Sequence, residues 1–354
     1  MLRHKCLRSF AVCLWWLSAI AVAGAEAKPL QSPWDLHPVA LTQAAYSCPA
    51  APRLPRDLNV NSYYSDSHHS IVDTAKQKTY QDATEPIEDF SRAVVKAADD
   101  YLQNGSRAAA ECVAALLAAA ANDKVLTGEM ETGQSHYVQG WQLGAWAVAY
   151  LKVRGSGAVT AEQSRQIASW FKRLAEGTRA YFDERRAKPG VNDAHNNHLY
   201  WAGFAIAAAG VASNDAKFFR WGMDAYREGI RDITPEGTLP REMDRAGRAL
   251  HYHLAALAPL VMLAEFGEAN GEDLYAERDF AIKRLVTRCI SGLEDPAYFV
   301  QKTGVKQDMP GEITAGEMGW AVPYVRRFPD PRISALLAKA PSTRYTTWGG
   351  LPPP

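Results

Sequence analysis

The sequence is poor in cysteine, with five in 354 residues. Two of them, Cys6 and Cys13, fall in an N-terminal apolar segment, so Cys48, Cys112 and Cys289 remain in the rest of the chain. None of these three has the spacing of a zinc site, which argues against a cysteine-based metal centre. An odd count in an exported chain allows one disulfide and one free thiol, and the residues alone leave all three pairings open.

The chain also lacks an excess of charge of either sign. Lys+Arg and Asp+Glu both number 39, so the formal net charge is +0 at pH 7. Without a global positive field, an acidic substrate must be bound by a local basic groove. The sequence contains no glycine-rich phosphate loop and no motif of interleaved basic and aromatic residues. We therefore expect no nucleic-acid partner.

Motifs for binding a metal are missing as well. His195 and His198 are three residues apart, and His251 and His253 flank Tyr252. The sequence nevertheless contains no His-Glu-x-x-His pattern and no carboxylate cluster of the calcium-loop type. We therefore predict that the protein requires no metal or other cofactor.

Outside the N-terminus, no stretch is expected to be long and apolar enough to cross a bilayer. Residues 1–25 place basic side chains before a short apolar run that ends in small residues, as in a cleaved secretory signal peptide. The alternative is a retained membrane anchor, but the run is short for a span of ~20 residues. We expect export to the periplasm and no membrane span after cleavage. The residues of this pattern are Arg3, His4, Lys5, Arg8, the run 10–22, Ala21, Ala23 and Ala25.

Helical periodicity dominates the remainder of the chain. Thr84 is predicted to cap a helix that begins before Pro86 and stops at Asn104 and Gly105. Little strand-like alternation occurs, so we predict a single all-α domain of stacked helical hairpins over residues 26–354. An extended surface segment is expected at 31–61, and an irregular tail after Leu337. Further helices are predicted near 107–121, 137–150, 160–174, 198–211, 215–230, 250–266 and 273–291.

Two short clusters hold most of the chemically useful side chains. The first is His195-Asn-Asn-His-Leu-Tyr-Trp201, and the second runs from Arg241 to His253. Arg245 and Tyr252 are seven residues apart. One helix would present both on the same face, because seven residues make about two turns.

At these clusters the sequence resembles polysaccharide lyase family 5, the periplasmic alginate (poly-mannuronate) lyases. The family patterns Asn-Asn-His-x-Tyr-Trp and Arg-x-x-Arg-Ala-Leu-x-Tyr-His match residues 196–201 and 245–253. The resemblance continues at 258–260, 270–274 and 302–309, and it covers most of the mature chain. It implies that the hairpins close into an incomplete α/α toroid with a substrate cleft, in a protein expected to be a monomer.

The resemblance also implies a disulfide between Cys48 and Cys112, with Cys289 left as a buried thiol. It further implies a lid loop at about 61–82 over the cleft. This chain has Tyr63 and Tyr64 where the family has a Lys-Tyr pair. The lost lysine changes how the lid contacts an anionic polymer.

The resemblance implies β-elimination, in which a base removes the C5 proton of a uronate and the bond from C4 to the bridging oxygen breaks. The uronate carboxylate resists the negative charge that develops, so it must be neutralised. Asn197 and Arg245 suit that task, since an amide NH2 and a guanidinium both donate to a carboxylate. His198 can add a hydrogen bond or a charge. Tyr252 is assigned both proton transfers, because the C5 hydrogen and C4 oxygen of mannuronate lie on one face.

Guluronate presents these atoms on opposite faces, so it would need a second group, for which His198 is the candidate. Aromatic and polar side chains are predicted to form a sugar-binding wall, although an aromatic stripe at helical spacing is also typical of a core. These wall residues are Tyr63, Tyr64, Gln134, Tyr137, Trp141, Tyr200 and Trp201. Arg248, His251 and His253 are weaker candidates.

The leading interpretation is an endo-acting lyase that cleaves mannuronate-rich alginate and leaves unsaturated uronate ends. One alternative is a broader lyase for glucuronate-containing polymers, suggested by the altered lid. A glycoside hydrolase would need two opposed carboxylates, for which Glu236, Glu242 and Asp244 are available without a matching motif. A non-catalytic polymer-binding or export component is the last alternative. In each case the partner is an anionic polysaccharide.

Overall fold

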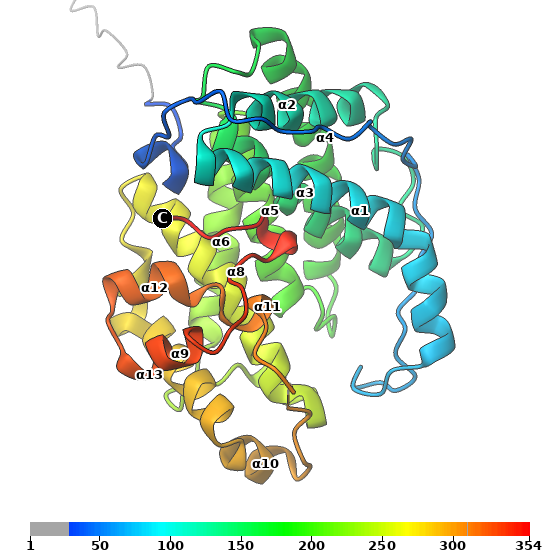
Figure 1. Cartoon of the computed structure of the whole chain (residues 1–354). Helices are drawn as coiled ribbons and strands as arrows, with labels where there is room; N and C mark the ends of the chain where they lie inside the picture. Colours follow the sequence, from blue (N-terminus) through cyan, green and yellow to red (C-terminus); the bar gives the residue numbers. More distant parts are fainter. Residues whose placement is uncertain (1–27, 310) are drawn as a thin grey trace, which may run out of the picture.

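The computed structural model describes residues 28–309 and 311–354, and the predicted signal peptide lies outside them (Figure 1). The helices are α1 (Thr74–Asn104), α2 (Arg107–Asn122), α3 (Gly133–Val153), α4 (Ala161–Arg186), α5 (Asn197–Ala212), α6 (Ala216–Asp232), α7 (Pro240–Met243), α8 (Ala249–Ala269), α9 (Glu277–Glu294), α10 (Ala297–Thr303), α11 (Ala315–Met318), α12 (Ala321–Arg327) and α13 (Pro331–Leu337). Within the described residues the only β structure is isolated bridges. The prediction of an all-α incomplete toroid of helical hairpins is confirmed.

Helix α5 lies at the centre of the fold. It packs against α3, α4, α6 and α8, and almost all of its residues are buried, which is why its sequence is apolar on every face. Close packing against α6 depends on glycine, because a Cβ on Gly203 would lie 2.6 Å from the Cβ of Ala225. The amino-terminal end of this rigid helix carries Asn197 and His198, so the core itself positions the first cluster.

Helix α1 begins eleven residues earlier than predicted. Its cap is Asp73, whose carboxylate accepts from the backbone N–H groups of Ala75 and Lys76, and Pro86 lies inside the helix. Proline lacks only one helical hydrogen bond, and packing of the surrounding buried face keeps α1 continuous. The predicted lid loop at 61–82 is therefore too long, because only its first part, up to Asp73, is a loop.

The lid is a small hairpin rather than an unstructured loop. Tyr64 and Val72 form an antiparallel bridge. At the tip, the carboxylate of Asp66 accepts hydrogen bonds from the backbone N–H groups of His68, Ser70 and Ile71 at 2.7–3.1 Å. These bonds lower the pKa of Asp66. Asp66 thus gives the lid a defined shape.

A disulfide between Cys48 and Cys112 attaches the extended N-terminal segment to α2, with a Cα–Cα distance of 5.5 Å. The pairing is the one that the family resemblance implied. Cys289 is a buried free thiol in α9. The segment also pairs with the helical body through the Leu58–Met130 bridge, so the N-terminal part of the chain is fixed at several points.

The C-terminal tail folds back onto α1 and α3, where the sequence indicated only irregular structure (Figure 1). Its anchor is a buried ion pair between Lys152 of α3 and Asp99 of α1, in which both side chains have no solvent exposure. Lys152 also donates to the backbone O of Gly349, and Asp99 accepts from the backbone N of Leu351 and from Arg344. These bonds hold the tail as one wall of a cleft.

Candidate active site

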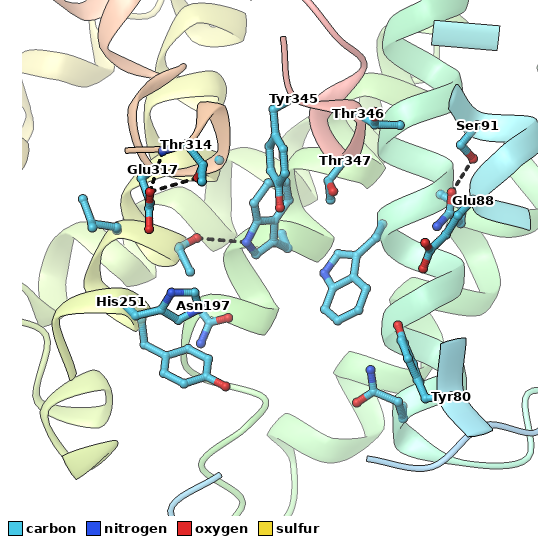
Figure 2. Close-up of a pocket in the computed structure, with 18 of the residues that line it drawn as sticks. Tyr80, Glu88, Ser91, Asn197, His251, Thr314, Glu317, Tyr345, Thr346 and Thr347 are labelled. Carbon is cyan, nitrogen blue, oxygen red and sulfur yellow. Dashed lines mark hydrogen bonds between the residues drawn. The ribbon is translucent and has the colours of Figure 1, made fainter. Parts of the chain in front are cut away.

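A cleft of about 510 Å³ lies between the lid, the tail and helices α1, α3, α5, α8 and α11. Figure 2 shows Asn197 and His251 on the side opposite Tyr80 and Glu88, with Tyr345 of the tail between them. Seven of the predicted site residues line this cleft: Tyr63, Tyr64, Gln134, Trp141, Asn197, Trp201 and Tyr252. Arg248 and His251, the weaker candidates, line it as well.

Tyr252 lies in the first turns of α8, facing the lid. Its hydroxyl donates to the hydroxyl of Tyr64 at 3.1 Å, and Arg248 donates to the same Tyr64 oxygen. The guanidinium of Arg245 lies over the Tyr252 ring, 3.8 Å from its centroid, and that of Arg248 lies 5.6 Å away. Two positive groups next to the ring stabilise negative charge that develops on the phenol oxygen.

Arg245 reaches Tyr252 by a route different from the one predicted. It precedes a 3-10 turn, Ala246–Arg248, and α8 begins only at Ala249. Ala246 has a φ of 49°, so one continuous helix does not carry both residues, and the prediction of a shared helical face is wrong. The fold-back of the turn brings the guanidinium against the ring instead. The Nε of Arg245 is buried and has no hydrogen-bond partner among the described residues.

Asn197 is the first residue of α5 and is held by a buried carboxylate. Asn196 caps the helix through its side-chain oxygen, which accepts from the backbone N of His198. Asn197 is thus free of the capping role, and its side-chain Nδ2 donates to both oxygens of Glu242 at 3.1 Å. Both oxygens belong to one carboxylate, so one amide hydrogen shared between them leaves the second hydrogen for a ligand in the cleft.

His198 does not line the main cleft. It lies in a small adjoining hollow, stacked on Tyr137 with ring centroids 4.1 Å apart. Burial, and after it the charge of Arg245, lowers the pKa of His198 to about 3, so the ring is neutral near pH 7. Tyr137 in turn donates to Asp193 at 2.6 Å, and Asp193 is paired with Arg185. Tyr137 therefore fixes His198 rather than lining the cleft.

Two further predictions of sequence reasoning are wrong. Tyr200 was expected in the sugar-binding wall but is 1% exposed, because the α5 face that carries it packs against Gly229 of α6. His253 is also a core residue, accepting from the backbone N of Leu239. Both belong to matched motifs, which shows that a motif includes residues that support the site as well as residues that contact a ligand.

Several cleft residues had no signal in the sequence. Glu88, Ser91 and Tyr80 all come from α1. Tyr80 precedes the predicted start of this helix, so the prediction did not place it on the same helix as the other two. Others come from α11 and the tail: Thr314, Gly316, Glu317, Tyr345, Thr346 and Thr347. Glu317 caps its own helix by accepting from the backbone N of Thr314. Only the tertiary fold brings these segments to the cleft.

No group of three or more His, Cys, Asp or Glu side chains suited to a metal occurs in residues 28–309 and 311–354. The charged groups of the site are the Arg245, Arg248 and Glu242 side chains, with Glu88, Arg92 and Glu317 at the walls. The cleft lining combines the phenol of Tyr252, the guanidinium of Arg248 and the fixed amide of Asn197, whereas Arg245 is not a lining residue and lies against the Tyr252 ring. Guanidinium and amide groups are suited to binding a carboxylate, and a phenol is suited to proton transfer.

Comparison with known proteins agrees with this arrangement. A model of the alginate lyase family matches residues 57–299. A polysaccharide lyase from Stenotrophomonas maltophilia is 40% identical over 295 residues, which cover 82% of this chain and 85% of that protein. An alginate lyase from Azotobacter chroococcum is 34% identical over 289 residues, which cover 79% of this chain and 76% of that protein.

Among solved structures, alginate lyase A1-III from Sphingomonas species A1 has the same fold, with a TM-score of 0.70 and 23% identity over 91% of this chain and 86% of that chain. A variant of alginate lyase A1-III complexed with a tetrasaccharide superimposes with a TM-score of 0.75 and 22% identity, over 92% of this chain and 89% of that chain. The family model covers more than half of the sequence, and the relatives exceed 30% identity over most of it. The chain therefore belongs to the alginate lyase family, and it is a polysaccharide lyase.

Proposed function

We propose that the protein is an endo-acting lyase that cleaves mannuronate-rich alginate by β-elimination and leaves unsaturated uronate ends. The observation that carries this proposal is the position of the Tyr252 hydroxyl in the cleft, with Arg245 against its ring at 3.8 Å and Asn197 on the same wall. A proton acceptor thus lies beside two donors for a carboxylate.

In the proposed reaction, Asn197 and Arg245 bind and neutralise the uronate carboxylate. The guanidinium of Arg245 against the Tyr252 ring supports this role, because it places a positive charge beside the reacting phenol. Tyr252 removes the C5 proton as a phenolate, and the same oxygen returns a proton to the bridging oxygen as the C4–O bond breaks. The reaction yields a double bond between C4 and C5 and a new reducing end, so atoms and charge balance.

Preference for mannuronate follows from the use of one residue for both proton transfers. This requires the C5 hydrogen and the C4 oxygen on the same face, as in mannuronate. Guluronate would need a second group on the opposite face, but His198 lies in the side hollow against Tyr137 rather than in the cleft. The volume of about 510 Å³ is in the range of pockets for ligands larger than one sugar, which supports binding within a polymer.

Poly-glucuronate is a second candidate substrate. Glucuronate differs from mannuronate only at C2, so one phenol can serve both. In the lid, Tyr63 stands where the family has lysine, and its ring packs 4.7 Å from Tyr64 and 5.2 Å from Tyr80. An aromatic lid contacts sugar faces rather than a specific carboxylate, which favours tolerance of different uronates.

Export to the periplasm is part of the proposal. The Cys48–Cys112 disulfide supports it, since disulfides persist in oxidising compartments. The basic and apolar pattern of residues 1–25 supports it as well.

The test is the ultraviolet absorbance of the conjugated unsaturated uronate, recorded with poly-mannuronate, poly-guluronate and poly-glucuronate in parallel. The proposal predicts the fastest rise on poly-mannuronate, with early products of many sizes. A rise only on poly-glucuronate would transfer the proposal to the second candidate. New reducing ends without absorbance would mean hydrolysis and would refute β-elimination.

A further inference from the structure

Glu242 is a buried carboxylate directly behind the proposed substrate-carboxylate site. Its side chain is 1% exposed and belongs to α7, outside the cleft lining. One oxygen accepts from the backbone N of Asn197 at 2.7 Å, and both accept from Asn197 Nδ2 at 3.1 Å. The second oxygen lies 3.9 Å from the Nε of Arg245. Glu242 therefore contacts both groups assigned to the substrate carboxylate.

The charged and titratable groups around Glu242 come from its own segment and from helices α5 and α6. Arg241 and Arg245 belong to its own segment, and the buried phenol of Tyr200 comes from α5. Arg241 is itself paired with Asp232 of α6, which reduces its effect on Glu242. Burial outweighs the bonds from Asn197 and the charge of Arg245 and raises the pKa of Glu242 to about 7. In the free protein the carboxyl is thus close to balance between its two protonation states.

A bound uronate would place a second carboxylate on the same two donors. Two carboxylates that share one site cannot both remain ionised at low cost, and the drier of the two is protonated first. Glu242 is enclosed, whereas a substrate carboxylate would lie in the open cleft.

On the basis of the proposed roles of Asn197 and Arg245, we propose that Glu242 is a positioning residue that takes up one proton from solvent when a uronate carboxylate binds beside it. The complex then holds Glu242 as a neutral acid, still hydrogen-bonded to Asn197. The substrate keeps its negative charge and receives the remaining N–H of Asn197 and the guanidinium of Arg245. Protonation of Glu242 thereby removes the repulsion between its carboxylate and the substrate carboxylate during the reaction.

The coupling has a defined pH signature. If binding raises the pKa of Glu242 by about one unit, the dissociation constant of a uronate oligosaccharide increases about threefold from pH 7 to pH 8. Glu242→Gln resembles the neutral acid in shape and still accepts from Asn197. We expect this variant to bind the oligosaccharide with little change over the same range.

The experiment is calorimetric binding of a mannuronate oligosaccharide to the full-length Tyr252→Phe protein, in which turnover is blocked. Titrations at pH 7.5 in two buffers of different ionisation enthalpy give the number of protons taken up. We expect about half a proton or more per site, and close to none when Glu242→Gln is added. Glu236→Gln is the matched control, because this glutamate is exposed and outside the cleft, and it should leave the uptake unchanged.

If the wild type cleaves the polymer but the Tyr252→Phe protein binds the oligosaccharide without taking up a proton, this inference is overturned and the proposed function stands. Uptake that persists in Glu242→Gln would also overturn it and would point to a cleft histidine such as His251. If Glu242→Gln does not fold, infrared difference spectra decide, since a protonated-carboxyl band must appear on binding and its absence refutes the inference. A protein that neither binds nor cleaves any polyuronate overturns both proposals.

Discussion

Replacing Lys152 with methionine tests whether the tail forms a structural wall of the cleft. The substitution keeps the length of the side chain and removes its charge. It leaves Asp99, which has no solvent exposure, with only Arg344 and the backbone N of Leu351, and it leaves the O of Gly349 unpaired. Removing one member of a buried ion pair typically costs 3–5 kcal/mol, and the remaining partners of Asp99 favour the lower end, about 3 kcal/mol.

For a chain of this size that loss lowers the melting temperature by about 6 °C, at about 2 °C per kcal/mol. The matched control is Lys172→Met, which breaks an exposed pair with Asp215 at 3.1 Å. Exposed pairs contribute about 0.5 kcal/mol, so this variant should melt within about 1 °C of wild type. Because Tyr345 and Thr347 line the cleft, Lys152→Met should also raise KM for the polymer.

Thermal unfolding followed by circular dichroism and steady-state kinetics on the same preparations provide the two readouts. Equal melting temperatures for Lys152→Met and Lys172→Met would refute the energetic reasoning. An unchanged KM in a clearly destabilised Lys152→Met protein would refute the assignment of the tail as a functional wall.

Three other predictions concern the lid, the disulfide and a buried histidine. Tyr64→Phe removes the oxygen that accepts from Tyr252, and kcat/KM should fall about fivefold while Tyr46→Phe, outside the cleft, has no effect. Reduction of the Cys48–Cys112 disulfide, which spans 64 residues, should lower the free energy of unfolding in urea by about 4 kcal/mol, and an unchanged midpoint would contradict this. Burial lowers the pKa of His253 to about 4, below its value in the unfolded chain. The contribution of neutral His253 to the free energy of unfolding is therefore present above about pH 6.5 and is lost as the pH falls toward 4. Between pH 7.5 and 5.5 that loss is about 1.4 kcal/mol, and His253→Gln should lessen the pH dependence of stability by that amount, whereas an equal slope in both proteins would refute it.

The helices of the core could be predicted because local patterns determine them. The start of α5 at Asn197 follows from an apolar run preceded by a capping asparagine, and the structure has that helix one residue from the predicted start. The start of α1 was missed because Pro86 is a strong local signal for a helix start, whereas the capping contribution of Asp73 depends on packing further along the helix.

The members of the site were harder to predict than its location. The motifs correctly predicted that Asn197, Arg245 and Tyr252 lie close together. The seven-residue spacing did not predict that a 3-10 turn, with Ala246 at positive φ, separates Arg245 from the helix that carries Tyr252. Tyr200 and Trp201 are neighbours in the sequence, yet one faces the core and the other the cleft. Glu242 became relevant only when its bonds to Asn197 were visible, since a lone glutamate carries no sequence signal.

The contribution of the tail could not be predicted from composition. Gly349 and Gly350 both have positive φ, and a Cβ on Gly350 would lie 2.4 Å from a carboxylate oxygen of Asp99. Such close contact is a property of two segments about 250 residues apart in the sequence, and only the fold brings them together.

The most direct test of the central claim compares wild type with Tyr252→Phe on poly-mannuronate. The variant keeps the ring that packs under Arg245 and removes the hydroxyl that we assign to both proton transfers. We predict that wild type produces a rise in the absorbance of unsaturated uronate. The rate of this rise should be at least about a hundredfold lower with Tyr252→Phe, while the variant still binds the polymer. A Tyr252→Phe protein that cleaves within about twofold of the wild-type rate would contradict the account.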